Sequence, residues 1–247
     1  MKISYIDSVT IKILFFSLVS MIAVPYYFAA GGTLLGFIII RLVAMLFGFC
    51  SQIGWHRWLT HRSFEPSALG RILLFLGMLF NGLGRPLHLV VSHIHHHKHS
   101  DTETDPHSPK YHNFLNLWLG RFTTINGASV PKTFFKDKQV LFFNKHYWTM
   151  FWIVNLIFCL IDFKSALIFC PVTIVYSWTL VTMVNYFGHK DKDEIGPRNL
   201  NSKLLTFLSG GEGLHKNHHD DPSNYSFGSK DRFDPGKPLI KYILMKR

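Results

Sequence analysis

Residues 165–187 read SALIFCPVTIVYSWTLVTMVNYF, a run without a single charged side chain. A helix needs roughly 20 apolar residues to cross the hydrocarbon core of a bilayer, so this run predicts a membrane span. Residues 13–30 form a second charge-free run, and residues 147–161 form a shorter one. Residues 33–53 are apolar except for Arg41, whose guanidinium is expected either to reach the nearer interface or to pair internally.

The four predicted spans form two hairpins, in which Gly31-Gly32 and residues 162–164 are the tight turns. Nearly all other segments fall on the opposite side of the membrane, where 24 of the 26 Lys and Arg residues lie. Because basic loops remain in the cytoplasm, that side is predicted to be cytoplasmic and to carry both termini. We therefore expect an all-α integral membrane protein with four transmembrane helices and a cytoplasmic helical cap, formed by residues 54–146 and 188–247.

Length and composition predict a single domain, residues 1–247. Of the 247 residues 48% are apolar, enough for one sizeable core. A net charge of +11 in so apolar a chain fits the cytoplasmic face of a membrane protein better than a nucleic-acid-binding surface. The three cysteines lie within apolar runs and lack the spacing of a zinc site or a disulfide framework. A short apolar stretch, residues 72–83, is expected to lie along the membrane interface.

A cleavable signal peptide is the competing interpretation of the N-terminal segment. Residues 1–30 contain Lys2, then an apolar run, then small residues at Ala29-Ala30, an order that fits a signal peptide loosely. Cleavage there would leave three spans and put the later histidine-bearing segments on opposite sides of the membrane. Four uncleaved spans keep those segments together and are our expectation.

The unusual feature of the composition is its 15 histidines, most of which gather in short clusters. The clusters read HRWLTH at residues 56–61, HIHHH at residues 93–97 and HKNHH at residues 215–219. In the pattern HxxHH the first, fourth and fifth residues fall within about 100° on a helix, so three imidazoles share one face. The two histidines of HxxxxH lie about 140° apart and are expected to address different metals or to sit across a helix end.

These faces predict a metal site. Eight clustered histidines are candidate ligands: His56, His61, His93, His96, His97, His215, His218 and His219. His95 points about 200° away from His93 and is excluded, and His99 is also unfavourably placed. The ninth candidate, His189, follows the last span, with Asn185 one turn earlier on the same face. Asn185 is expected either to hold a metal-bound water or to bond locally, and the remaining histidines are taken as ordinary polar residues: His88, His107, His112 and His146.

Three carboxylates near the clusters, Asp101, Asp105 and Glu212, are expected to accept hydrogen bonds from ligand ring N–H groups. So many neutral imidazoles suit iron, copper, nickel or zinc rather than magnesium or calcium. Iron fits best, because a structural or hydrolytic zinc needs fewer ligands and the HExxH motif of zinc proteases is missing. A loosely chelating histidine tract in a metal-transport protein is the alternative, against which three separate clusters argue.

With these motifs the chain resembles the membrane fatty-acyl desaturases of the Δ9 type. HRWLTHRSFE (56–65), HIHHHKHSDTETDPHSP (93–109), NYFGH (185–189) and GEGLHKNHH (211–219) stand in the order of that family. The resemblance implies four membrane helices below a cytoplasmic cap, and two iron ions held by the nine histidines named above, with Asn185 contributing through water. It further implies O2-dependent desaturation of a fatty-acyl chain.

The resemblance leaves the acyl carrier open between a membrane lipid, CoA and acyl carrier protein. Acyl-CoA members carry acidic, aromatic and basic residues just before the second cluster, where this chain reads LVVS at residues 89–92. The flanking motifs look more like those of bacterial acyl-lipid members, which implies a bacterial inner membrane. No cytochrome b5 signature follows the third cluster, so a separate ferredoxin or cytochrome b5-like electron donor is expected to dock on the basic face.

The resemblance also implies an apolar substrate tunnel between the spans, whose closed end we expect around Ile40 and Ala44. Two other functions remain open. A fatty-acyl hydroxylase would use the same irons and return oxygen to the chain. A histidine-rich metal transporter would place ionisable residues within its spans, whereas here they lie mainly outside them.

Overall fold

The computed structural model describes residues 6–121, 132 and 134–246. Four long helices dominate this part of the chain: α1 (Ile6–Ala29), α2 (Leu34–Gln52), α6 (Lys138–Ile161) and α7 (Phe163–His189). The π-helix η1 (Ile53–Thr60) continues α2 without a break. The other elements are α3 (Ala68–Asn81), α4 (Pro86–His99), α5 (Phe114–Trp118), the 3-10 helix η2 (Phe134–Lys136), β1 (Lys190–Asp191), β2 (Glu194–Ile195), α8 (Lys203–Leu208), α9 (His215–Asp220), α10 (Gly236–Leu239) and the π-helix η3 (Ile240–Leu244).

Short polar side chains begin several of these helices. The Thr33 hydroxyl accepts a hydrogen bond from the backbone N–H of Gly36 at the start of α2. Asp137 does the same for two backbone N–H groups of α6, and Asp162 for Ser165 at the start of α7. Each cap satisfies a backbone donor that has no partner within its helix, so the sequence sets these boundaries locally.

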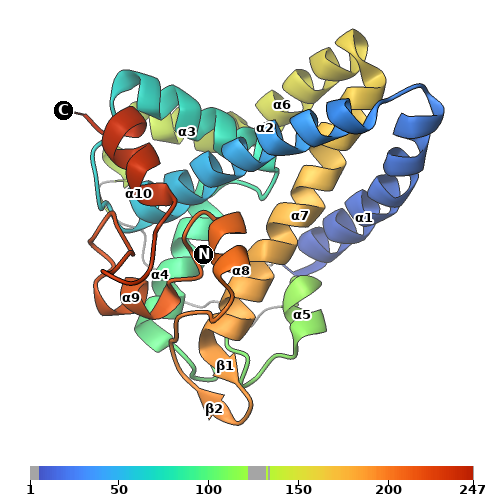
Figure 1. Ribbon diagram of the computed structural model, residues 1–247. Helices are drawn as coiled ribbons and strands as arrows, with labels where there is room; N and C mark the ends of the chain where they lie inside the picture. The colour runs from blue at the N-terminus through green and yellow to red at the C-terminus, as the bar shows by residue number, and fades with distance from the viewer. Residues whose placement is uncertain (1–5, 122–131, 133, 247) are drawn as a thin grey trace.

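The two hairpins turn at the same end of the molecule. Lys164 donates a hydrogen bond to the carbonyl oxygen of Ala30 at 3.4 Å, and the rings of Tyr26 and Phe163 lie 6.0 Å apart. Figure 1 shows both turns at the upper right, with α9 and the β1–β2 hairpin in the lower part of the molecule. The two tight turns predicted from the sequence therefore lie next to each other.

Three helices in the described residues are long and apolar enough to cross a membrane: Val9–Ala29, Leu34–Thr60 and Phe163–His189. They coincide with three of the four predicted spans. The fourth predicted span, residues 147–161, lies in α6, which does not meet the same criterion. A fourth crossing by this criterion exists only if α3 and α4, which are bent by 89° at their junction, count as one broken span.

Helix α7 is the inner member of the bundle. In the most apolar 18-residue stretch of α7, 56% of the residues are buried. The corresponding share is 22% in α1 and 22% in α2 with its extension η1. The outer helices present large apolar side chains to their surroundings, including Met21, Leu35 and Leu160. Exposed apolar surface on this scale favours contact with lipid. Arg41 pairs internally, since its guanidinium donates to the Thr173 hydroxyl of α7 at 2.9 Å.

Helix α3, which contains most of the stretch predicted to lie along the interface, packs closely on α2. Its Gly77 permits the contact, because a Cβ atom at this position would lie 2.6 Å from the Cβ of Cys50 and 2.7 Å from the carbonyl oxygen of Phe47. The helix ends at Gly82, which takes the left-handed conformation (φ +62°). The chain then reverses into α4, which carries the second histidine cluster.

We predict that Gly77→Ala destabilises the protein by roughly 1–3 kcal/mol, because the added methyl group forces α3 away from α2. Thermal unfolding in detergent measures the effect. The matched control is Gly48→Ala in α2, where a Cβ atom has no neighbour within 4 Å. That variant should be neutral or slightly more stable, since alanine is the better helix former. Equal unfolding temperatures for the two variants would contradict the prediction.

Candidate dimetal site

Two neighbouring groups of histidines come together where η1, α4, α7 and α9 meet. In each group every histidine offers one ring nitrogen, and these nitrogens all lie within 4.8 Å of one another, so the group could hold a metal ion. We call them the five-histidine group and the four-histidine group. The first consists of His56, His61, His93, His97 and His218, and the second of His96, His189, His215 and His219. All nine histidines singled out from the sequence are therefore brought together.

Both HxxHH clusters divide their histidines between the groups. His93 and His97 of α4 face the five-histidine group, whereas His96 faces the four-histidine group. In α9, His218 joins the first group, while His215 and His219 join the second. The rings of His97 and His219 lie between the groups and stack, with centroids 4.3 Å apart. A face about 100° wide thus serves two adjacent sites.

The prediction that His56 and His61 address different metals is wrong, because both belong to the five-histidine group. The 140° separation assumed an α-helix, but residues 53–60 form a π-helix. In a π-helix the hydrogen bonds run from residue i to residue i+5, so residues five apart lie nearly above one another. The backbone N–H of His61 donates to the carbonyl oxygen of His56 at 3.1 Å. The alternative, that the pair sits across a helix end, agrees with His61 as the residue that ends η1.

Each of the three carboxylates from the sequence analysis lies against the outer nitrogen of one of these histidines. Nδ1 of His56 lies 2.5 Å from Glu212, and Nδ1 of His96 lies 2.9 Å from Asp105. Nδ1 of His189 lies 2.9 Å from Asp101. An ionised carboxylate only accepts hydrogen bonds, so the proton of each neutral ring belongs on Nδ1 and the lone pair on Nε2.

Those Nε2 atoms point into the two groups. Nε2 of His56 lies 3.1 Å from Nε2 of His218, and Nε2 of His189 lies 2.9 Å from Nε2 of His215. Nε2 of His96 is buried and has no hydrogen-bond partner among the described residues. Converging lone pairs in a buried space are unfavourable by themselves and are satisfied by a cation. The donor set therefore fits two transition-metal ions with imidazole ligands.

Burial keeps the rings of the third cluster neutral. The pKa values of His215 and His218 are lowered well below the ordinary value, first by burial and then by the neighbouring imidazoles. The pKa of His219 is lowered for the same reasons. Burial alone would raise the pKa of Glu212, but nearby His56 and Arg57 outweigh it and hold the value below its usual range. Neutral imidazoles beside an ionised carboxylate are the protonation states that metal binding requires.

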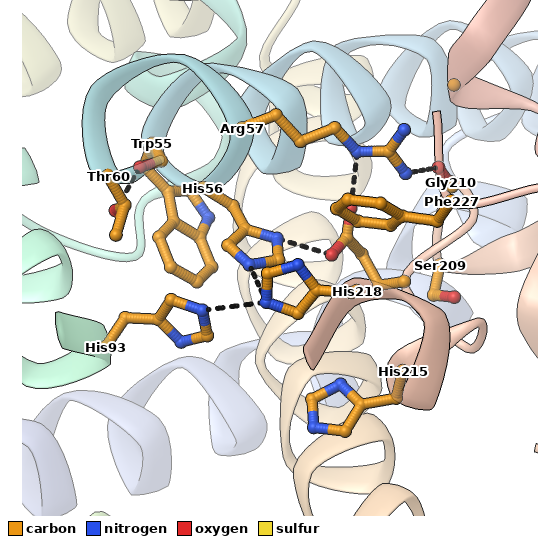
Figure 2. Close-up of polar contacts among 12 residues, drawn as sticks. Trp55, His56, Arg57, Thr60, His93, Ser209, Gly210, His215, His218 and Phe227 are labelled. Carbon is orange, nitrogen blue, oxygen red and sulfur yellow. Dashed lines mark hydrogen bonds and ion pairs between the residues drawn. The ribbon is translucent and has the colours of Figure 1, made fainter. Parts of the chain in front are cut away.

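A buried arginine, which sequence reasoning treated only as one more basic residue, links the first cluster to the third. The guanidinium of Arg57 is fully buried and donates to Asp234 at 2.7 Å, to Glu212 at 3.2 Å and to the carbonyl oxygen of Gly210 at 3.1 Å. It also lies over the ring of Phe227, 3.8 Å from its centre. Figure 2 shows Arg57 and His56 reaching from η1 toward the segment that carries Ser209 and Gly210. The signal in the sequence was an arginine directly beside a ligand candidate.

A predominantly apolar cavity adjoins the histidines. Its walls come from α2, α7 and the 208–212 segment, and its lining includes Gly48 and Tyr176. At one end it reaches His56 and His93 of the five-histidine group and His215 of the four-histidine group. The cavity thus touches both groups.

The remaining predicted residues lie around this centre. Asn185 lines the cavity but belongs to neither group. Ile40 and Ala44 do not line the cavity, whose α2 wall begins at Met45, one residue further along the chain. Among the histidines outside both groups, His95 contacts the carbonyl oxygen of Thr104 and His107 contacts the hydroxyl of Ser92. His99 is exposed.

Together, the fold and the site define a helical protein with candidate membrane spans and two histidine groups that could each hold a metal ion, beside an apolar cavity. The fatty acid desaturase family model matches residues 18–226. The chain belongs to the fatty acid desaturase family, a class of oxidoreductases.

Three curated relatives illustrate the range within the family. The chain is 31% identical over 182 residues to the sn-1 stearoyl-lipid 9-desaturase of Anabaena variabilis, covering 70% of this chain and 66% of that protein. It is 28% identical over 197 residues to an acyl-CoA 5-desaturase of Anemone leveillei, covering 73% and 59%. It is 23% identical over 150 residues to the hex-5-enoyl-[acyl-carrier protein] acetylenase of Moorena producens, covering 55% and 46%. The chain thus spans less than two thirds of the length of these relatives.

We predict that Asp234→Asn destabilises the fold by about 3–5 kcal/mol, because it leaves a buried guanidinium without its closest anionic partner. The exposed Asp231, three residues earlier, provides the matched control Asp231→Asn. Thermal unfolding of the two variants in detergent compares the losses. An Asp234→Asn protein as stable as the control would show that Arg57 does not depend on this pair.

Proposed function

We propose that the chain is an O2-dependent fatty-acyl desaturase with two histidine-bound iron ions. The observation that carries the proposal is the apolar cavity whose lining includes histidines of both groups. A saturated acyl chain is apolar along its whole length and offers no polar group near the carbons that react. A cavity with apolar walls and a dimetal end suits such a substrate better than it suits a polar one.

The proposed ligands divide as the two groups do. The five-histidine group offers one metal five imidazoles, and the four-histidine group offers the other metal four. Asn185, on the cavity wall beside the four-histidine group, is proposed to complete the second site through a water molecule. Glu212, Asp105 and Asp101 hold the rings of His56, His96 and His189 so that each Nε2 faces its metal.

When bound, the iron pair would supply the oxidising chemistry, in which dioxygen, two electrons and two protons take two hydrogens from neighbouring methylene groups and leave as two water molecules. The protein supplies position and dryness. The cavity walls hold one pair of methylenes beside the centre, since positioning decides which C–H bonds react. Trp55 lines the same cavity close to His56 and helps to exclude water from the reacting end.

Several finer features belong to the same proposal. The similarity to the stearoyl-lipid 9-desaturase favours Δ9 chemistry on a lipid-bound chain, while CoA and acyl carrier protein stay as alternative carriers. Electrons are proposed to come from a separate ferredoxin or cytochrome b5-like protein. The basic residues outside the spans favour a cytoplasmic site, with both termini on that side and the bacterial inner membrane as the location. The family match favours this enzyme over the metal transporter.

The main test of the proposal compares fatty-acid profiles in a bacterial host that expresses the wild type, His218→Ala or His99→Ala, with a suitable electron donor. His218 is fully buried in the five-histidine group, so its loss should abolish new double bonds and lower the iron content. His99 is exposed on α4 and outside both groups, so its variant should behave like the wild type.

Gas chromatography with mass spectrometry reads the result. Products lighter by two hydrogens establish desaturation and locate the double bond. Products heavier by one oxygen identify a hydroxylase instead. Wild-type protein that contains no iron would contradict the proposal of a diiron centre.

A separate prediction concerns the length of the acyl chain that the enzyme accepts. Gly48 lines the cavity, and a side chain there would enter open space. Gly48→Leu should therefore shorten the cavity and shift the products toward shorter acyl chains without loss of iron. Ala44→Leu is the comparison, because Ala44 is buried but lies outside the cavity lining. An active Gly48→Leu enzyme with an unchanged chain-length profile would argue against this route for the substrate.

A further inference from the structure

A second large depression lies away from the histidines, between α3 and α6. This interface groove has a volume of about 990 Å³ and shares no lining residue with the apolar cavity of the dimetal site. Its lining comes from residues 65–79, residues 138–150 and Lys246 near the C-terminus. Figure 1 shows α3 close to the C-terminal end of the chain.

One end of the interface groove is basic. Arg71, Lys138 and Lys246 line it, and Arg62 and Lys136 line the small pocket that adjoins it. The carboxylates in the same two linings are Glu65 and Asp137, and both are engaged by Arg71, at 2.8 and 2.5 Å. None of the ion pairs formed by the described residues uses the lysines at positions 136, 138 and 246. Five cations against two carboxylates leave this end with a net charge of +3, which favours an anion.

The floor of the interface groove is apolar. Ile72, Phe75 and Leu76 of α3 face Phe142 and Met150 of α6 across it. Ile72 and Phe142 are exposed by 56% and 61% of their surfaces. Positions 142, 150, 153 and 157 follow one face of α6 at helical spacing, and Ile153 and Ile157 are also exposed. The apolar floor therefore continues along α6 toward the turn at Asp162, away from the basic end.

We propose that the interface groove binds one anionic phospholipid, with its phosphate among the lysines and its acyl chains over the apolar floor. Along α6 the basic end comes first and the apolar floor follows, which matches the charged headgroup and the acyl chains of such a lipid. The basic end of the groove lies where α6 begins and its apolar end lies within the helix, as for a lipid standing in one leaflet beside the protein. This lipid is separate from the substrate, because its groove does not reach the histidine groups.

An acidic protein partner is the other occupant that the cations would attract. Exposed apolar side chains continuous with the outer surface of α6 favour the lipid, since an acidic protein surface would leave this floor uncovered. A soluble phosphate compound would likewise use only the basic end. The test therefore varies three things independently: the headgroup of the lipid, the presence of acyl chains, and the side chains that line the groove.

The experiment titrates the full-length, iron-loaded protein in detergent with dioleoyl-phosphatidylglycerol, dioleoyl-phosphatidylcholine or glycerol 3-phosphate and counts bound molecules by native mass spectrometry. The anionic lipid should bind most tightly, and glycerol 3-phosphate should not be retained. In Lys138→Gln/Lys246→Gln the affinity for the anionic lipid should fall roughly thirtyfold, the order expected for two basic residues near an anionic headgroup. Phe142→Gln, which leaves the charges of the groove unchanged, should weaken the binding of both lipids.

The matched control is Lys203→Gln/Lys230→Gln, which removes the same charge from exposed positions outside the groove. It should retain the wild-type affinity, and unchanged unfolding temperatures in detergent alone show that each variant is folded. Equal binding of the two lipids, or equal losses in the two lysine pairs, would overturn the proposal. Retention of glycerol 3-phosphate with the affinity of the lipid would assign the basic end to free phosphate compounds instead.

Discussion

A single buried guanidinium holds the two sides of the histidine site together. Arg57 leaves η1 next to His56 and meets Asp234, Glu212 and the carbonyl oxygen of Gly210, all in the C-terminal part of the chain. Removing such a group from water is costly unless every donor finds an acceptor, so the charge ties these distant segments to one arrangement. Gly211 contributes room, because its left-handed backbone (φ +99°) passes the guanidinium and Asp234 where a Cβ atom would collide with both. The first and third clusters meet because this contact is satisfied.

In the same part of the molecule, carboxylates orient three of the clustered imidazoles. Glu212 accepts from Arg57 and also lies against Nδ1 of His56, so one side chain serves both the fold and the ligand. Asp105 and Asp101 repeat the second role for His96 and His189. A ring with its proton on the outer nitrogen presents a lone pair inward. Much of the apparent surplus of histidine and acid in the sequence is thereby explained by one centre.

Two apolar spaces lie on opposite sides of the packed helices α2 and α3. The cavity between α2 and α7 ends at the histidines, and its open space beside Gly48 suits one chain without polar groups. The interface groove between α3 and α6 is open, wider and basic at one end. Close packing of α3 on α2 through Gly77 separates the two spaces. The two proposals therefore use separate apolar spaces, the cavity for the substrate and the interface groove for an anionic lipid.

The sequence by itself determined the four long helices, three of which are candidate membrane spans, the nine candidate histidines and the family, because these depend on local composition and short spacings. It indicated Asp101, Asp105 and Glu212 through their nearness to the clusters, although not which ring each carboxylate meets. Tertiary structure decided the division of each HxxHH between two groups, since that depends on which neighbours approach the helix. It also decided the π-helical turn that unites His56 with His61, and the pairing of Arg57 with Asp234, residues far apart in the chain. The cavity and the interface groove exist only between packed helices, so no periodicity along one segment could have placed Gly48 or Lys246 in them.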